Sequence, residues 1–271
     1  MKKKAGSILF ETIRILLGLC MLFPIILALF VAFMPKADIL AAPFRLTLEN
    51  ATLANYIEAF QYLNLGTYMK NTFVMIAVCL PARLITSLLA AYAFSHFEFP
   101  FKNTIFAVLL TAMMIPGEVM EITLFKMILK WDLIDTYAGL TVTGLTDVAA
   151  VFLFRQTMQS MPKVLREAAV IDGCGDMRYF FHILVPMCKT MIITFALRAF
   201  VSIYNSYMWP LLVTTKDEMR TVQTGVASIA WSSHDGLTLA AATITSLIPL
   251  LIYFFGMDKI VEGMTAGAVK S

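Results

Sequence analysis

The chain has 271 residues, of which 59% are hydrophobic and only 14% are charged, and its mean hydropathy is +0.79. Soluble domains carry about 25% charged residues, so this composition excludes an ordinary soluble protein and predicts a polytopic membrane protein. The net charge of +3 is small and the basic residues are dispersed, which argues against nucleic acid as a partner. The four cysteines form no CxxC pair, so we predict neither a disulfide framework nor a zinc site.

Apolar runs along the chain predict an all-α fold with six transmembrane helices. The first run, of about 22 residues, is longer than the 7 to 15 residues of a signal-peptide core, so we interpret it as a membrane span. Pro81 and Arg83 in the second run predict a kink or break, and Pro116 interrupts the third. A surface helix is expected near 55–62, between the first two runs. The six runs are 13–34, 68–95, 104–115, 138–154, 187–213 and 237–257.

The distribution of lysine and arginine predicts the orientation of these six spans. With both termini inside the cell, twelve of the 21 basic residues fall in cytoplasmic segments and seven in exterior segments. Arg83 and Arg198 are the two that fall within spans. Because cytoplasmic loops carry an excess of lysine and arginine, we expect both termini and residues 162–186 to be cytoplasmic.

Residues 162–186 lie between two apolar runs without being apolar themselves. Each charge there would cost roughly 2.5 to 3.5 kcal/mol at the centre of a bilayer, so the segment belongs in water or against another protein. Gly173 and Gly175 predict the end of one short helix, and Asp176 is expected to cap a second helix that leads to Pro186. The charged residues are Lys163, Arg166, Glu167, Asp172, Asp176, Arg178 and His182.

The spacing of seven residues in this segment resembles the EAA loop of ABC importer permeases, in which EAA is followed by a glycine and then by I-x-L-P. Val185 stands where the family usually has leucine, a change from one apolar residue to another. The matching residues are Glu167, Ala168, Ala169, Gly173, Ile183 and Pro186. The resemblance implies a cytoplasmic pair of coupling helices that fits a groove on an ATPase subunit.

The same resemblance assigns a role to individual residues of the loop. In related importers the acid at the position of Glu167 faces a basic residue of the ATPase, whereas the simpler interpretation is a solvated charge on a helix. Small side chains at Ala168 and Ala169 would allow close docking, and Gly173 would supply the hinge. The predicted ATPase-coupling residues are Arg166, Glu167, Ala168, Ala169, Asp172, Gly173, Ile183 and Pro186.

Further motifs extend the resemblance over about residues 68–271, to the carbohydrate-uptake branch and in particular to permeases of the maltose-transporter type. They are Pro116-Gly117, the run 135–140, Phe154-Arg155-Gln156, Trp209-Pro210-Leu211 and the tail 263–270. The resemblance implies that the tail forms a second ATPase contact through Thr265, Ala266, Gly267 and Lys270. We accordingly divide the chain into an N-terminal part (1–67), a permease core (68–260) and a cytoplasmic tail (261–271).

Three charges fall deepest in the predicted spans: Arg83, Asp147 and Arg198. Such groups usually face a bundle interior, where they pair with each other or contact substrate. An ion pair of Asp147 with one arginine would leave the other arginine available for an anionic or hydroxylated solute. Asn205 and Trp209 belong to a polar and aromatic run that suits either a sugar path or an interfacial aromatic belt.

The sequence thus predicts a non-catalytic permease subunit of a sugar or oligosaccharide importer in a bacterial inner membrane. The resemblance implies a second permease, an ATPase dimer that binds ATP and magnesium, and an extracytoplasmic solute-binding protein as partners; this chain itself has no phosphate-binding loop and no cofactor. A glycerol-3-phosphate importer is the alternative, supported by similarity around Pro116 and Trp209. An ion-coupled secondary transporter is a further alternative, which would need more mid-membrane carboxylates than Asp147.

Overall fold

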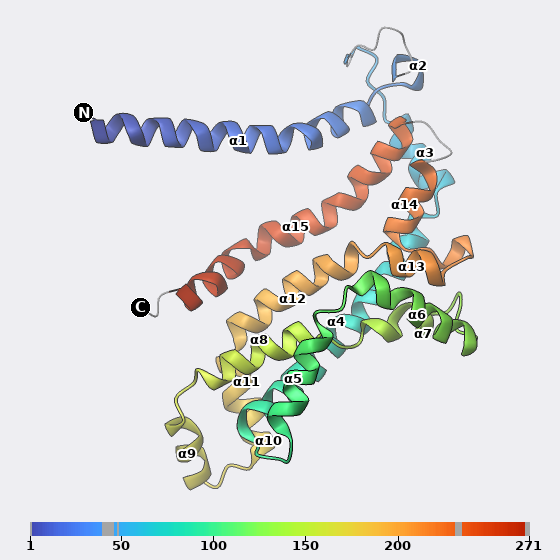
Figure 1. Ribbon diagram of the computed structural model, residues 1–271. Coiled ribbons are helices and arrows are strands. Elements are labelled where there is room, and N and C mark those ends of the chain that lie inside the picture. The colour runs from blue at the N-terminus through green and yellow to red at the C-terminus, as the bar shows by residue number, and fades with distance from the viewer. Residues whose placement is uncertain (1, 40–45, 48, 231–234, 269–271) are drawn as a thin grey trace. The chain divides into compact units, whose positions relative to one another are not determined.

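The computed structural model describes residues 2–39, 46–47, 49–230 and 235–268, and every regular element in these ranges is a helix (Figure 1). The predicted all-α fold is therefore confirmed. The chain forms two compact units, one made of Met1–Gly66 with Thr224–Ile248 and the other of Thr67–Gln223 with Pro249–Ser271. The 162–186 loop lies entirely in the second unit.

The first unit holds the N-terminal helices and part of the C-terminal ones. Within it, Asn55 is buried and donates hydrogen bonds to the carbonyl oxygens of Ala32 and Met34, at 2.9 and 2.8 Å, which ties α3 to the end of α1. The helix predicted near 55–62 is confirmed as α3. The elements are α1 (Lys2–Ala32), α2 (Lys36–Ile39), α3 (Ala54–Tyr62), most of α14 (Val222–Ala230) and the first part of α15 (Asp235–Ala268).

The second unit carries most of the remaining helices and the candidate site. They are α4 (Leu65–His96), α5 (Lys102–Ala112), α6 (Gly117–Lys130), α7 (Tyr137–Thr141), η1 (Val142–Gly144), α8 (Val148–Gln159), α9 (Val164–Ile171), α10 (Asp176–Tyr179), the π-helical turn η2 (Phe180–Leu184), α11 (Val185–Met187), α12 (Lys189–Tyr204), α13 (Met208–Val213) and η3 (Asp217–Met219). The rest of α15 also belongs to this unit.

Among the described residues, three helices are long and apolar enough to cross a membrane without a break: α1, α4 and α15. Three bent pairs raise the number of possible spans to six if each pair crosses once: α5 with α6 (96°), α7–η1 with α8 (41°) and α10–α11 with α12 (74°). The interruption predicted at Pro116 is the 96° bend. At Pro81, where a kink or a break was predicted, there is no break, because α4 continues as one helix from Leu65 to His96.

The main core of the second unit lies where α4, α8 and α12 meet the short helices of the 162–186 loop. The ring of Tyr92 in α4 lies 5.0 Å from that of Phe180, and the ring of Phe154 in α8 lies 5.5 Å from that of Phe195 in α12. Ala169 of α9 is buried in the same cluster. The loop is therefore packed onto the ends of the long helices, and its position depends on theirs.

Candidate functional site

A glycine hinge ends the first short helix of the 162–186 loop. Gly173 has a φ of +72°, the left-handed conformation that only glycine adopts without strain. The amide of Cys174 donates to the carbonyl oxygen of Ala169 at 2.8 Å, and the amide of Gly173 to that of Val170 at 3.0 Å. This pair of bonds is a Schellman motif, which satisfies the last carbonyl groups of α9. The predicted pair of short helices joined by a hinge is therefore present.

The second short helix begins differently from the prediction. Gly175 occupies the cap position of α10 without a side-chain hydrogen bond, so the prediction that Asp176 caps this helix is wrong. The carboxylate of Asp176 instead accepts hydrogen bonds from Arg166, at 3.1 Å, and from the Tyr92 hydroxyl, at 3.4 Å. A tertiary partner has displaced the local capping bond that the sequence pattern favours.

The helix α9 has two opposite faces. Ala169 is only 5% exposed and packs in the core, whereas Ile171 is 85% exposed and Val170 is 62% exposed. Glu167 is also exposed. Exposed large apolar side chains beside a charge, in a segment too polar for the bilayer, are typical of a surface that binds another protein.

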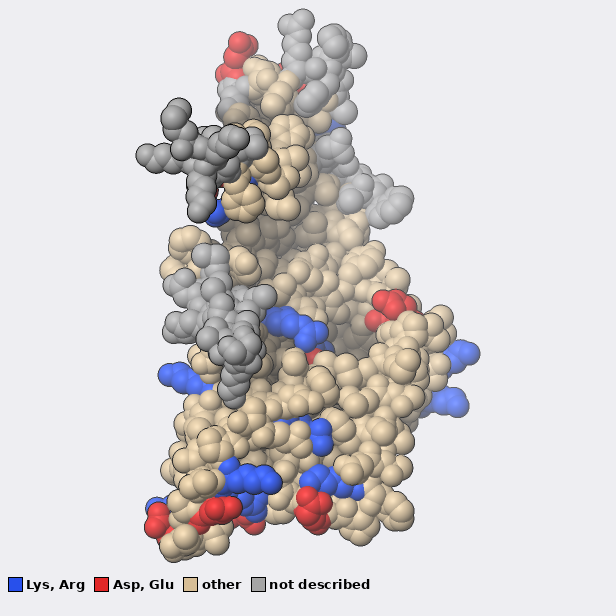
Figure 2. Space-filling view, turned by 60° about the vertical axis from the view of Figure 1, so that its left-hand side comes forward, with Lys and Arg blue, Asp and Glu red and all other residues tan. Residues whose placement is uncertain are grey.

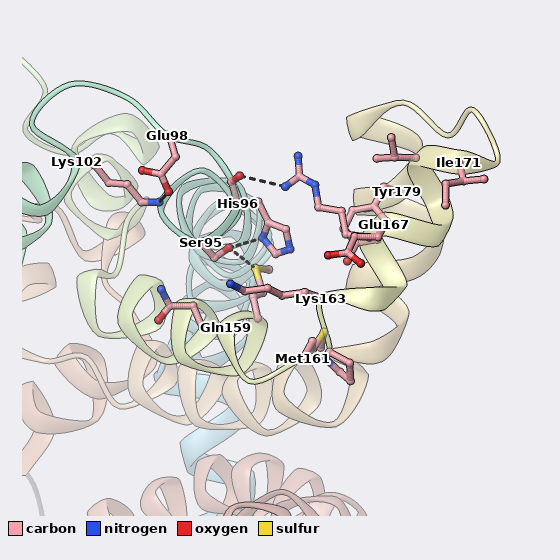
Figure 3. Close-up of a pocket in the computed structure, with 14 residues that line it drawn as sticks. Ser95, His96, Glu98, Lys102, Gln159, Met161, Lys163, Glu167, Ile171 and Tyr179 are labelled. Atoms are coloured by element: carbon pink, nitrogen blue, oxygen red, sulfur yellow. Dashed lines mark hydrogen bonds and ion pairs between the residues drawn. The ribbon is translucent and has the colours of Figure 1, made fainter.

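A groove of about 830 Å³ separates α9 from the ends of α4 and α8. Figure 3 shows Ser95 and His96 from the end of α4 on one side of it, with Lys163 and Glu167 on the α9 side. Figure 2 shows charged side chains gathered at the bottom of the view, the level at which α9 and α10 lie in Figure 1, next to a broad uncharged surface. The groove belongs to this charged end, because Glu98, Lys102, Lys163, Arg166 and Glu167 are among the residues that line it.

Arg166 points into the chain rather than away from it. Its guanidinium donates to the His96 carbonyl oxygen at 3.1 Å and to Asp176 at 3.1 Å, and it lies 5.8 Å from the centre of the Phe97 ring. Its side chain is 29% exposed. His96 and Tyr92, which complete this arrangement, carried no signal in the sequence, because they contact residues 70 and 84 positions away.

The predicted coupling residues divide by exposure. Both alanines were expected to allow close docking, but only Ala168 is exposed, and Ala169 serves the internal packing described above. In the predicted tail contact, Thr265, Ala266 and Gly267 fall within α15, and Lys270 lies outside the described residues. The exposed coupling residues are Glu167, Ala168, Asp172, Gly173 and Pro186, and the half-buried ones are Arg166 and Ile183.

The two charges predicted in the second and fourth spans make hydrogen bonds to the backbone of this chain. Arg83 donates to the carbonyl oxygen of Gly144 at 2.7 Å. Asp147 caps α8, since its carboxylate accepts a hydrogen bond from the Ala150 amide at 3.1 Å. Among the ion pairs of the described residues none includes Asp147, so the structure does not contain the alternative Asp147 to arginine pair.

The other predicted pathway residues do not converge on one site. Trp209 is 6% exposed, and its indole N–H donates to the Gly139 carbonyl oxygen at 3.2 Å. Asn205 is exposed and accepts a hydrogen bond from Gln223 at 3.2 Å, and Arg198 is exposed on α12. Within the described ranges no group of three His, Cys, Asp or Glu side chains could hold a metal ion.

These features define the class: an α-helical membrane protein with a hinged, charged loop whose inner face is packed on the spans and whose outer face is free. Comparison with known proteins agrees with that class. A family described as "Binding-protein-dependent transport system inner membrane component" matches residues 83–264. The chain belongs to this family and is the permease subunit of an ABC importer.

Several relatives cover nearly the whole chain. The chain is 30% identical to the sn-glycerol-3-phosphate transport system permease protein UgpE of Pectobacterium atrosepticum, over 97% of this chain and 98% of that protein. It is 27% identical to the arabinooligosaccharides transport system permease protein AraQ of Halalkalibacterium halodurans, with full coverage of both. A solved bacterial ABC transporter involved in the import of alginate has a similar fold, with a TM-score of 0.82 at 19% identity, over 96% of this chain and 97% of that one.

Proposed function

We propose that the 162–186 loop docks a separate ATPase on the cytoplasmic side and that this chain forms half of the translocation pathway. The observation that carries the proposal is the two-faced α9, which buries Ala169 in the core and leaves Glu167, Val170 and Ile171 exposed. In this arrangement ATP binding and hydrolysis take place in the partner. The loop converts the motion of that partner into movement of the helix ends on which it is packed.

The partners follow from the family and from the predicted orientation. A binding-protein-dependent system includes a solute-binding protein, which would deliver solute on the outer side. A second permease would complete the pathway, and the tail residues Thr265, Ala266, Gly267 and Lys270 would add a second ATPase contact. Both termini would then be cytoplasmic, in agreement with the excess of basic residues in the predicted inner segments.

For the solute, we infer a sugar or oligosaccharide. Relatives named for arabinooligosaccharide transport and a similar fold in an alginate importer support a carbohydrate. Glycerol-3-phosphate is the second candidate, because UgpE proteins reach 30% identity and Arg198 is exposed on α12, where a guanidinium could bind a phosphate. Calorimetry of the cognate solute-binding protein with both classes of solute separates the two.

The docking proposal is tested by reversing one exposed charge. Glu167→Arg should fold normally, because the side chain is exposed, but the purified complex should lose most of its ATPase subunit and its transport. Glu218→Arg is the matched control, because it also reverses an exposed charge. Glu218 lies near the N-terminal end of α4, where its backbone oxygen is bonded to Asn71, and the loop is packed at the other end. Unchanged assembly and transport in Glu167→Arg would refute the docking site.

The cytoplasmic position of the loop has a separate test. A cysteine introduced at Val170, which is 62% exposed, should react with a membrane-impermeant maleimide in inside-out vesicles from cells that lack the ATPase, which would otherwise cover it, and remain unlabelled in intact cells. The unsubstituted chain gives the background from its own cysteines, of which Cys20 is exposed. Labelling in intact cells would place the loop outside and would contradict the proposal.

A further inference from the structure

The C-terminal end of α4 is held by three cationic side chains from three different elements. The last carbonyl groups of a helix have no partner within it, and they form the negative end of its dipole. Basic side chains are therefore favourable there. The bonds are Arg155 Nε of α8 to the Phe94 oxygen at 3.3 Å, Arg166 Nη1 of α9 to the His96 oxygen at 3.1 Å, and Lys102 Nζ of α5 to the Phe97 oxygen at 2.7 Å.

Arg166 alone among these three belongs to the 162–186 loop, and it also closes a ring of contacts. Its second terminal nitrogen donates to the carboxylate of Asp176 at 3.1 Å. The hydroxyl of Tyr92 in α4 donates to the backbone oxygen of Asp176 at 3.2 Å and lies 3.4 Å from its carboxylate. The two short helices of the loop are thus bonded to each other and to the same end of α4.

We propose that Arg166 is a positioning residue that locks α9 and α10 to the end of α4, so that a force applied to the loop moves this helix. The inference rests on the proposed docking of an ATPase at the loop. It gives Arg166, which the sequence predicts as an ATPase-coupling residue, a role inside the chain. The two neighbouring residues then have different roles. Glu167 is exposed and contacts the partner, while Arg166 is bonded to the end of α4 and transmits the movement inside the chain.

The chemistry of arginine suits this position better than that of lysine. The guanidinium is a rigid fork whose nitrogens donate in separate directions, which matches a carbonyl oxygen on one side and a carboxylate on the other. An ammonium group is a single compact charge on a flexible chain. Arg166→Lys should therefore keep the charge and lose one of the two contacts.

The test compares Arg166→Met with Arg178→Met in the assembled transporter. Both variants remove one positive charge from the loop, but the Arg178 side chain is exposed and takes part in none of the ion pairs of the described residues. Arg166→Met should retain its ATPase subunit and the KM for solute, while solute transported per ATP hydrolysed falls about tenfold. Arg178→Met should keep the coupling ratio, that is, the solute transported per ATP hydrolysed. Arg166→Lys should give an intermediate ratio, and it replaces Arg166→Met in the comparison if the methionine variant folds poorly.

A double-mutant cycle shows whether Arg166 acts through Asp176. Because the two side chains are bonded, the coupling ratio of Arg166→Met with Asp176→Asn should be no lower than that of Arg166→Met alone. Additive losses, an unchanged ratio in Arg166→Met, or loss of the ATPase subunit from that variant would each overturn the assignment.

A measurement on the isolated chain separates this inference from the proposed function. Hydrogen exchange of the α9 amides, followed in nanodiscs without any ATPase, should be about tenfold faster in Arg166→Met than in the unsubstituted chain. Equal exchange rates would refute the lock whether or not an ATPase binds. Failure of the unsubstituted chain to bind an ATPase would refute the docking proposal and leave the exchange result intact.

Discussion

The two ends of α4 are fixed by different chemistry. At the N-terminal end, Asn71 is 1% exposed, donates to the carbonyl oxygens of Glu218 and Arg220 at 2.8 and 2.9 Å, and accepts from the Tyr137 hydroxyl at 2.8 Å. At the C-terminal end the holding groups are the long cationic side chains of Arg155, Arg166 and Lys102, none of which is buried.

This difference suits different tasks. A short amide with both of its polar atoms bonded in a buried site has little freedom, since any movement would leave buried polar groups unpaired. Long cationic side chains at a partly exposed helix end bond its carbonyl oxygens without being buried themselves, so this end can move together with the elements that carry those side chains. We therefore interpret the Asn71 end as the fixed anchor of α4 and the end near the 162–186 loop as the adjustable one.

The largest effect is expected at the anchor. Asn71→Leu would remove three hydrogen bonds and leave the Tyr137 hydroxyl and two carbonyl groups without this partner, which should cost about 3 kcal/mol. The apparent Tm of the protein in nanodiscs, followed by intrinsic fluorescence, measures the loss. Asn205→Ala is the control, because Asn205 is exposed, and it should leave the Tm nearly unchanged. Equal losses in the two variants would refute the anchor.

Only part of this arrangement could be predicted from the sequence. The bilayer imposes long apolar runs, so hydropathy predicted α4, and the left-handed conformation at Gly173 follows from glycine chemistry. The partners of Asn71 lie 147 and 149 residues away, and no local pattern reports such a contact. The same limit explains the error at Asp176, for which a distant tyrosine and an arginine competed with the local cap.

At the adjustable end, Arg155 should contribute most to stability. Its guanidinium lies 4.1 Å from the centre of the Phe106 ring and donates to the Phe94 carbonyl oxygen, so it joins α8 to both α4 and α5. Arg155→Met should cost about 2 kcal/mol through the loss of the cation–π contact and the charged hydrogen bond. Thermal unfolding measures this loss of stability. If Arg155→Met lost more stability than Asn71→Leu, the C-terminal end of α4 rather than the Asn71 end would be the anchor.

A smaller effect is expected at the hinge, where no charge is involved. Gly173→Ala would force a side chain into the left-handed conformation, at a cost of about 1 kcal/mol. Gly175→Ala is the matched control, because that residue has a φ of −70° and no atom within 4 Å of an added Cβ. Unfolding experiments should show a loss only at Gly173, and transport should fall there as the end of α9 shifts. Equal behaviour of the two variants would contradict the hinge.

The smallest effect concerns a carboxylate that supports the anchor from the neighbouring loop. Asp135 accepts hydrogen bonds from the backbone amides of Thr215 and Lys216, at 2.6 and 2.9 Å, just before η3. Burial raises the pKa of Asp135, but these bonds, the Thr215 hydroxyl and the Lys216 charge together outweigh it, so the pKa lies below its ordinary value. The ionised carboxylate is therefore more favourable in the folded chain than in the unfolded one.

The sign of this shift fixes the expected pH dependence. The contribution of Asp135 is fully present above the ordinary pKa of an aspartate, and it is lost as the pH falls through the lowered pKa of the folded state. Asp135→Asn should thus lower stability by less than about 1 kcal/mol near neutral pH, and the Tm difference between the two chains should shrink on acidification. A difference that stays constant or grows in acid would mean that Asp135 acts through its shape rather than through its charge. In that case Asp135 would support the anchor end of α4 without the help of its charge, and the contrast with the cationic end would be sharper.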